Sequence, residues 1–357
     1  MFPIHVIFMS NAGGMLMTFG KRMKIALIGA VIASLAGSLF VLLLSESARM
    51  LTIISLIVAV AVLGLVLVAQ FILEGKPAKV RVPVFILIVV LSVCTVLSVA
   101  LYNIGKKITF PGTSDEEAYE ELCDMDGVVV QIDEGNLSGW RIPATAVAEG
   151  EPRPVILYFG GNGENSSHRV ENMLSNEKSS YLYENYDFFF MDYPSYGNND
   201  TELTEDSLYQ FTLDAYNYVS SLDTTSGITL LSYSIGNGPA MYLASQDDVN
   251  IDSMIMLAPY NSGYDLYNAN LNIFYGPLRL LVAFKLPSYK YAADVECPVT
   301  MIASTDDEII PYESSRNLFS SLSGGAANFV TVEGVLHNDF FSSPEVINAI
   351  RNSLEAA

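Results

Sequence analysis

Long apolar stretches dominate the first hundred residues of the chain. Three runs of about 20 residues or more carry almost no charge: residues 24–44, 50–73 and 82–102. At 1.5 Å rise per residue, about 20 helical residues cross a hydrocarbon core of about 30 Å. The pattern therefore predicts an N-terminal segment (1–23) followed by a region of three transmembrane helices (24–107).

The first apolar run has a second interpretation. Lys21, Arg22 and Lys24 precede it, and Ala36-Gly37-Ser38 resembles a signal-peptidase site, so the run has features of a cleaved signal sequence. The run continues past that site to Leu44, which favours an uncleaved anchor. Met23 is also an alternative start of translation, which leaves open whether the residues before it are translated.

The remaining chain has a different periodicity. After a polar linker (108–125), short apolar runs alternate with helical patterns over residues 126–357. A hairpin is expected at 128–133 and 136–142, followed by strands at 155–159, 188–191, 228–231, 254–257, 299–303 and 329–332. Most of these runs are continuous, as in parallel strands that are buried on both faces. Helices are expected at 204–221, with Thr204 as the cap, and at 344–354. The alternation predicts one α/β domain with a mainly parallel sheet.

Charge divides the chain at the same place. Of 18 Lys and Arg residues and 39 acids, residues 1–107 hold nine bases and two acids, and the remainder holds nine bases and 37 acids. An acidic domain of this kind repels nucleic acid and anionic lipid headgroups, so neither is an expected partner of its surface. Six bases flank one side of the predicted membrane region and three flank the other. The positive-inside rule then places the N-terminus in the cytoplasm and the large domain outside, in a multi-pass protein of the cell membrane.

The three cysteines, Cys94, Cys123 and Cys297, say little about the redox compartment. Cys94 lies in a predicted span, while Cys123 and Cys297 are far apart in sequence and open to pairing. Reduced, buried thiols are the favoured interpretation.

A candidate nucleophile follows the strand expected at 228–231. Ser234 has small residues, Ser232 and Gly236, two positions before it and two after it. Such spacing is typical of a nucleophile elbow, in which a serine on a strained turn joins a strand to a helix and its flanks must be small. Asp307 and His337 follow in the order Ser, Asp, His, which is the order in hydrolases of this kind.

A serine hydroxyl needs a base within hydrogen-bond reach, and that base needs a third group to fix its tautomer. Of the three histidines, His5 precedes the first span and His168 fits a surface helix, whereas His337 lies in a loop after the last expected strand. The loop after the strand at 299–303 offers three acids, Asp306, Asp307 and Glu308. The pattern alone leaves the choice among them open.

Catalysis at a carbonyl also needs backbone N–H groups that face the developing oxyanion. The loop after the strand at 155–159 reads Gly160-Gly161-Asn162-Gly163-Glu164-Asn165, and its glycines allow close approach of the backbone. The Asn162 N–H is the expected donor, with the Ile235 N–H at the helix start as the second. A phosphate loop is disfavoured because no Gly-Lys-Ser/Thr or G-x-G-x-x-G frame is present.

Five motifs in this order resemble those of membrane-anchored α/β-hydrolase-domain proteins, the relatives of serine aminopeptidases and acyl-protein thioesterases that lack a large lid. The motifs are Phe159-Gly160-Gly161-Asn162-Gly163-Glu164-Asn165, Asp192-Tyr193-Pro194-Ser195-Tyr196-Gly197, Ser232-Tyr233-Ser234-Ile235-Gly236, Asp307-Glu308-Ile309-Ile310-Pro311 and Leu336-His337-Asn338-Asp339. The resemblance implies an α/β-hydrolase fold over residues 126–354.

The resemblance also implies site residues and their roles. In the related proteins the orienting acid precedes a Glu, two aliphatic residues and a Pro, which selects Asp307. The resemblance then implies Ser234 as nucleophile and His337 as general base. It implies no cofactor or metal. Departures from the pattern are Gly160 in place of a frequent His, Ser232 in place of Gly, and Ser304 in place of Gly before the acid loop. The missing loop His leaves open how the oxyanion loop is braced, and the three spans are not general in the family.

The expected function is therefore a membrane-anchored serine hydrolase of esterase or thioesterase type, acting on a small or lipid-like acyl substrate. An aminopeptidase or an acyltransferase would use the same three residues, and a non-catalytic tethered binding protein would keep only the fold. About 40 residues between Leu257 and Cys297 are too few for a lid domain. They are expected to pack as ordinary helices, with an acyl-binding wall or contact with the membrane interface as alternatives.

Overall fold

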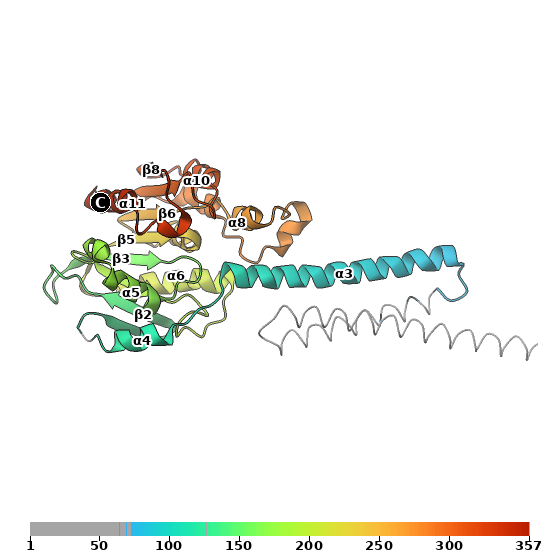
Figure 1. Ribbon diagram of the computed structural model, residues 1–357, viewed down its shortest axis with the longest axis horizontal. Coiled ribbons are helices and arrows are strands. Elements are labelled where there is room, and N and C mark those ends of the chain that lie inside the picture. Colours follow the sequence, from blue (N-terminus) through green and yellow to red (C-terminus); the bar gives the residue numbers. More distant parts are fainter. Residues whose placement is uncertain (1–63, 65–68, 70–72, 126, 357) are drawn as a thin grey trace, which may run out of the picture. The chain divides into compact units, whose positions relative to one another are not determined.

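The computed structural model describes residues 64, 69, 73–125 and 127–356 (Figure 1). The first predicted span, 24–44, and nearly all of the second, 50–73, lie outside the described residues, as does His5. The chain forms two compact units, Met1–Ile104 and Gly105–Ala357. The second unit contains the α/β domain.

The third predicted span lies in helix α3, Ala78–Thr109, which has 32 residues. Its most apolar 18-residue window has a mean hydropathy of 3.0, and within the described part of the chain it is the one helix long and apolar enough to cross a membrane. At 1.5 Å per residue the helix is about 48 Å long, more than a hydrocarbon core requires. The structure thus describes one candidate span where the sequence predicts three.

The second unit is built on an eight-stranded sheet (Figure 1). The strands are β1 Val130–Glu134, β2 Leu137–Ile142, β3 Arg153–Phe159, β4 Asp187–Met191, β5 Thr225–Tyr233, β6 Ser253–Leu257, β7 Val299–Ser304 and β8 Ala327–Val332. Their order across the sheet is β1-β2-β4-β3-β5-β6-β7-β8. The pairs β1–β2 and β2–β4 are antiparallel and the other pairs are parallel.

Burial along the strands explains the apolar patterns in the sequence. Every residue of β4 and β6 is buried, whereas in the edge strand β1 only the central residue is buried. Strands in the middle of a parallel sheet are covered on both faces and therefore read as continuous apolar runs. The strands expected from these runs are all present, and their ends differ from the expected ones by at most three residues.

Helices connect the strands and cover the sheet. The α-helices of this unit are α4 Glu116–Cys123, α5 Ser166–Ser175, α6 Glu205–Ser220, α7 Asn237–Ala244, α8 Gly263–Asn270, α9 Ser288–Tyr291, α10 Tyr312–Phe319 and α11 Pro344–Ala356. Short 3₁₀ helices are η1 Glu177–Leu182, η2 Ser234–Gly236, η3 Gly276–Leu281, η4 Ala292–Asp294 and η5 His337–Asp339. Crossovers between parallel strands are right-handed. Helix α5 leads from β3 toward β4, in one direction across the sheet, whereas α6 and α7 lead in the other direction. Helix α5 therefore lies on the face of the sheet opposite to α6 and α7.

Local sequence explains where these helices begin. The side chain of Thr204 accepts a hydrogen bond from the Ser207 N–H at the start of α6, and the Ser207 side chain accepts one from the Thr204 N–H, which is a capping box. Asp115 caps α4 with a single hydrogen bond, which its side chain accepts from the Ala118 N–H. Helix α4 lies in the segment expected as a linker, 108–125, and its Leu122 is buried against the α/β core.

The parallel strands place the candidate chemistry at one edge of the sheet. The loops that follow β3, β5, β7 and β8 begin at Gly160, Ser234, Thr305 and Glu333. Because the carboxyl ends of parallel strands share an edge, these four loops lie together. Open α/β sheets bind their ligands at this edge.

Candidate active site

Ser234 occupies a strained turn between β5 and α7. Its φ is 53°, in the left-handed region that side chains other than glycine rarely adopt. A Cβ on Gly236 would lie 2.2 Å from the carbonyl oxygen of Phe159, so only glycine fits there. Ser232 is fully buried, and its hydroxyl donates to the Asn237 side chain at 2.7 Å. The small flanking residues thus let the turn pack closely against β3 and α7, which projects Ser234 from the end of the strand.

The structure brings Ser234, His337 and Asp307 into one hydrogen-bonded line. His337 Nε2 lies 2.9 Å from Ser234 Oγ. On the other side of the ring, His337 Nδ1 lies 2.8 Å from Asp307 Oδ2 and 3.0 Å from Oδ1. The carboxylate accepts a hydrogen bond from Nδ1–H, which leaves Nε2 with a lone pair toward the serine hydroxyl. In this tautomer the imidazole is ready to accept the Ser234 proton.

Each of the three neighbouring acids has its own hydrogen bonds. Asp307 Oδ1 also accepts from the N–H groups of Ile309 and Ile310, at 2.9 and 2.8 Å, and these bonds fix the carboxylate. Its side chain is 2 % exposed. Asp307 is the acid that contacts the imidazole.

Asp306 and Glu308 accept hydrogen bonds from backbone N–H groups of the loop that contains His337. Asp306 Oδ2 accepts from the Gly334 N–H at 2.7 Å, and this hydrogen bond lowers the pKa of Asp306. Glu308 Oε2 accepts from the backbone N–H of His337 at 3.0 Å. The sequence analysis gave neither of these two acids a role of its own. Their contacts join two loops that lie about 30 positions apart, and no local pattern shows such contacts.

Tyr233 is a site residue that the sequence reasoning missed. Its hydroxyl donates to the His337 carbonyl at 2.7 Å, and its ring stacks on the imidazole with centroids 5.1 Å apart. Burial raises the pKa of the Tyr233 hydroxyl, so that the group stays a donor. Its position directly before Ser234 was the one signal in the sequence that pointed to it.

The Gly-rich loop after β3 lies next to the elbow. Glu164 folds back over this loop, where its Oε2 accepts from the Gly161 N–H at 2.7 Å and from the Tyr158 hydroxyl at 2.8 Å. A Cβ on Gly160 would lie 2.8 Å from the same carboxylate oxygen. The space where the related motif has a larger residue is therefore filled by Glu164, which the sequence did not indicate.

The remaining candidates lie away from the site. His168 is on α5 with its side chain 54 % exposed, and its Nδ1 lies 3.2 Å from Asp115, as expected for a surface position. Cys94, Cys123 and Cys297 are all free, but Cys94 and Cys123 are exposed and Cys297 is only partly buried, so the expectation of buried thiols was wrong. Among the residues that the structure describes, no group of three His, Cys, Asp or Glu side chains could hold a metal ion.

The segment after β6 packs in two parts. Tyr260 is fully buried and its hydroxyl donates to the Ile235 carbonyl at 2.9 Å, directly behind the elbow. Tyr267, Phe274 and Val282 form a small separate cluster. Five large apolar residues between them are exposed: Leu271, Ile273, Tyr275, Leu278 and Leu280. Part of the segment thus packs as ordinary structure, and part of it presents apolar side chains to the surroundings.

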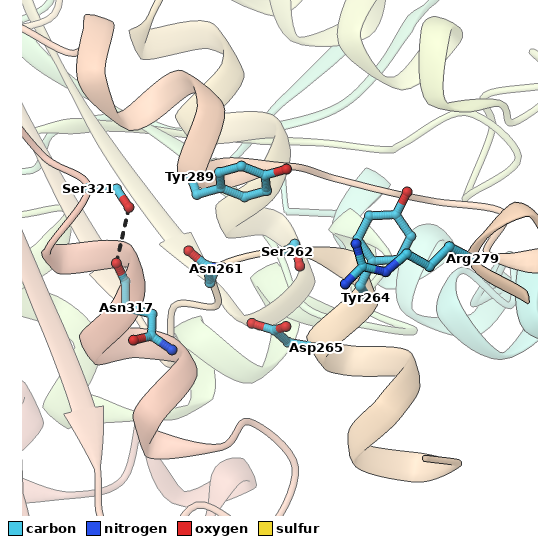
Figure 2. A pocket seen from close by; sticks show the side chains of 8 residues that line it. All are labelled: Asn261, Ser262, Tyr264, Asp265, Arg279, Tyr289, Asn317 and Ser321. Carbon is cyan, nitrogen blue, oxygen red and sulfur yellow. Dashed lines mark hydrogen bonds between the residues drawn. The ribbon is translucent and has the colours of Figure 1, made fainter. Parts of the chain in front are cut away.

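A polar hollow of about 350 Å³ lies between α8 and α10 (Figure 2). Its lining includes Asp265, Arg279, Asn317 and Ser321. Arg279 lies over the Tyr264 ring, 5.0 Å from its centroid. None of Ser234, Asp307 and His337 lines this hollow, so it is separate from the hydrogen-bonded line described above.

Comparisons with known proteins agree with this architecture. No family model matches the chain. An uncharacterised protein of Mycobacterium tuberculosis is 27 % identical over 232 residues, which is 64 % of this chain and 78 % of that protein. The α/β-hydrolase domain-containing protein aho-3 of Caenorhabditis elegans is 25 % identical and covers 48 % of this chain and 49 % of its own length. Human protein ABHD12B is 23 % identical and covers 56 % of this chain and 60 % of its own length.

Solved structures show the same fold. Est1E from Butyrivibrio proteoclasticus superposes with a TM-score of 0.51 at 17 % identity, over 64 % of this chain and 98 % of Est1E. A second structure of Est1E, with ferulic acid bound, gives a TM-score of 0.50 at 16 % identity, over 63 % of this chain and 99 % of Est1E. Identity this low supports the fold and not the substrate. The sheet, the strand order and these relatives together identify the chain as an α/β-hydrolase-fold protein, homologous to α/β-hydrolase domain proteins.

Proposed function

We propose that the protein is a serine hydrolase that cleaves an ester or thioester through an acyl-enzyme intermediate. The observation that carries this proposal is the continuous hydrogen-bonded line from Ser234 Oγ through the His337 ring to Asp307, with distances of 2.9 and 2.8 Å. Nucleophile, base and orienting acid are thus within hydrogen-bond reach of one another. The strained turn under Ser234 gives the hydroxyl a fixed direction at the carboxyl edge of the sheet.

The reaction follows from this geometry. Ser234 Oγ attacks the acyl carbonyl carbon while its proton passes to His337 Nε2, and Asp307 stabilises the imidazolium that forms. When the tetrahedral intermediate collapses, His337 returns the proton to the leaving alcohol or thiol. Water then attacks the acyl group with His337 again as base, and Ser234 is released as a free hydroxyl.

Backbone donors stabilise the oxyanion in this scheme. We assign that role to the N–H of Asn162 in the loop after β3 and the N–H of Ile235 at the start of η2. Loss of one such donor typically lowers turnover by about 10²- to 10³-fold. Close packing of Gly236 against the carbonyls of Phe159 and Gly160 supports the assignment, because it brings the two loops together.

A fluorophosphonate probe on the full chain in detergent tests the proposed nucleophile. The wild-type protein should be labelled, and Ser234→Ala should abolish labelling without lowering the midpoint of thermal unfolding. Ser321→Ala, which removes a hydroxyl from the separate hollow of Figure 2, is the matched control and should keep full labelling. Labelling of Ser234→Ala at wild-type rate would refute the assignment.

The acyl substrate class is tested with the same protein. Labelled, active enzyme is offered p-nitrophenyl esters of short and long acyl chains, the matching acyl thioesters, and aminoacyl amides. Turnover of esters and thioesters supports the proposal. Turnover of the aminoacyl amides alone would instead favour an aminopeptidase, and acyl transfer to an added alcohol in preference to water would favour an acyltransferase.

The protein is also proposed to be an integral membrane protein with three spans and an extracytoplasmic hydrolase domain. Helix α3 supports the third span by its length and by a mean hydropathy of 3.0, with none of its most apolar window buried. Proteolysis of intact cells tests the orientation. External protease should cut within residues 105–357, and complete protection of that region in intact but not permeabilised cells would refute the orientation.

The exposed apolar part of the segment after β6 fits contact with the membrane interface. Residues 266–293 contain Arg279, Lys285 and Lys290 but no acid, whereas the rest of the region 108–357 has 37 acids and six bases. Leu280 is 79 % exposed and Tyr275 is 54 % exposed. Anionic headgroups repel the acidic body, whereas this basic and apolar stretch can enter the headgroup region.

A further inference from the structure

The end of helix α3 is bonded directly to the Gly-rich loop. Residues 105–113, here called the strap, comprise the last turn of α3 and the four residues after it, and they belong to the same compact unit as the α/β domain. The side-chain amide of Asn162 donates to the carbonyls of Ile108 at 2.6 Å and Thr109 at 3.0 Å. Thr113 Oγ1 donates to the Gly163 carbonyl at 2.9 Å.

These contacts satisfy groups that a helix leaves without partners. The last four carbonyls of an α-helix have no N–H donor inside the helix, and they carry the negative end of its dipole. The Lys106 carbonyl accepts from the Phe110 N–H. Asn162 serves those of Ile108 and Thr109, and therefore acts as a side-chain cap on the C-terminal end of α3.

The side-chain cap matters because the backbone of Asn162 is part of the Gly-rich loop. Asn162 has glycine on both sides of it in the sequence, at positions 161 and 163, so local conformational preference does little to fix its N–H. Glu164 holds the loop from one side through the Gly161 N–H. On the other side the Asn162 amide and the Thr113 hydroxyl tie it to the strap. The proposed oxyanion donor is thus at the centre of a braced loop.

The strap itself is held independently of Asn162. Phe110 is 4 % exposed, and its ring packs edge-on against Tyr193, Tyr196 and Phe284. Thr109 Oγ1 donates to the Tyr267 hydroxyl at 2.8 Å. Truncation of the Asn162 side chain should therefore free the loop while the strap stays in place.

We propose that Asn162 is a positioning residue: by capping α3 its side chain holds its own backbone N–H toward the reacting carbonyl, and the end of α3 becomes part of the catalytic architecture. The inference rests on the proposed hydrolase function. A misplacement of about 1 Å in a group that contacts the reacting atoms can cost about 10²-fold in rate. The expected signature is a loss in the transition state with substrate binding preserved.

The test compares Asn162→Ala and Asn162→Asp with the wild-type full chain in detergent. Three quantities are measured: kcat per fluorophosphonate-titrated site, KM for a p-nitrophenyl ester, and Ki for a trifluoromethyl ketone with the same acyl chain, which mimics the oxyanion. For Asn162→Ala, kcat should fall about 10- to 100-fold and the Ki should rise by the same factor, with little change in KM. Asn162→Asp should lose more, because its carboxylate would face two carbonyl oxygens.

Asn176→Ala is the matched control. Asn176 also caps a helix, since its side chain accepts from the Lys178 N–H at 3.1 Å, but it lies after α5. This variant should keep the wild-type kcat and Ki even where its unfolding midpoint falls. The proposal is overturned if Asn162→Ala keeps wild-type kcat per titrated site and Ki, including the case in which only the titratable fraction or the unfolding midpoint falls. A wild-type protein that fails to label would instead refute the hydrolase function itself.

Discussion

Replacement of Asp307 by Asn is expected to lower kcat by about 10⁴-fold, or about 5 kcal/mol of transition-state stabilisation. The size of the effect follows from the hydrogen bonds of the carboxylate. Oδ1 accepts from the N–H groups of Ile309 and Ile310, at 2.9 and 2.8 Å. An Asn side chain must keep its oxygen at that position, because an NH₂ group there would face two donors. Its nitrogen then takes the place of Oδ2, 2.8 Å from His337 Nδ1.

A donor at that position reverses the histidine tautomer. The Asn NH₂ is then the nearer group to Nδ1, at 2.8 Å against 3.0 Å for Oδ1, and as a donor it favours an accepting Nδ1. The imidazole proton then moves to Nε2, which lies 2.9 Å from Ser234 Oγ. Nε2 then cannot accept the serine proton, although the three side chains keep their places. Since Asn has nearly the shape of Asp, the unfolding midpoint should change little, which separates a chemical loss from a structural one.

The assay is steady-state hydrolysis of a p-nitrophenyl ester, corrected for titrated sites, together with the second-order rate of fluorophosphonate labelling. Asp306→Asn is the matched control, because Asp306 accepts from the Gly334 N–H and does not contact the imidazole. It should lose far less activity than Asp307→Asn. The reasoning is refuted if Asp307→Asn keeps activity within about tenfold of wild type, a change of only about 1.4 kcal/mol.

Three further predictions concern packing, ionisation and the membrane. Gly236→Ala should destabilise the protein by about 1–3 kcal/mol, because its Cβ would meet the carbonyl oxygen of Phe159 at 2.2 Å; calorimetry should show a lower unfolding midpoint, and an unchanged midpoint would contradict the close packing. Burial raises the pKa of the Cys297 thiol from its ordinary value of 9.0 to about 11. Its alkylation by iodoacetamide at pH 8 should therefore be about 100-fold slower than that of an unshifted thiol, and the rate should still rise about tenfold per pH unit up to pH 9.5. A rate that reaches a plateau below pH 9 would disprove this pKa. In lipid nanodiscs, the added fluorescence of Leu280→Trp should be quenched by brominated lipid and that of Val130→Trp, on the edge strand, should not; equal quenching of both would argue against interfacial contact of the segment after β6.

The strands and the order of the loops were predictable from the sequence because they depend on local pattern. Continuous apolar runs correspond to strands buried on both faces, and the expected strand at 254–257 is observed as Ser253–Leu257. The helix expected at 204–221 is observed as Glu205–Ser220 with Thr204 as its cap. Small residues around Ser234 indicated the turn, since steric demand at an elbow is also local.

The braces of the site were not predictable because they join distant segments. Tyr233 donates to a carbonyl 104 positions away, and Glu308 accepts from an N–H 29 positions away. Neither contact leaves a periodic signal, and an acid in a turn usually indicates only solvation. The contact of Thr113, in the segment 108–125 that was expected as a linker, was not predictable for the same reason, because its partner Gly163 lies 50 positions away.

The strap links the proposed oxyanion donor to the segment after β6. Thr109 contacts both sides, since its carbonyl accepts from Asn162 and its hydroxyl donates to Tyr267. Tyr267 packs edge-on against Phe274, with ring centroids 5.4 Å apart, next to the exposed apolar residues of that segment. A displacement of that segment would therefore reach Asn162 of the Gly-rich loop through Thr109, as would a displacement of the last turn of α3. Because that loop contains three glycines and has little stiffness of its own, its conformation depends on these neighbours. In this architecture the parts proposed to meet the membrane also hold one side of the Gly-rich loop, whereas the Ser234, His337 and Asp307 line is held separately by Tyr233, Asp306 and Glu308.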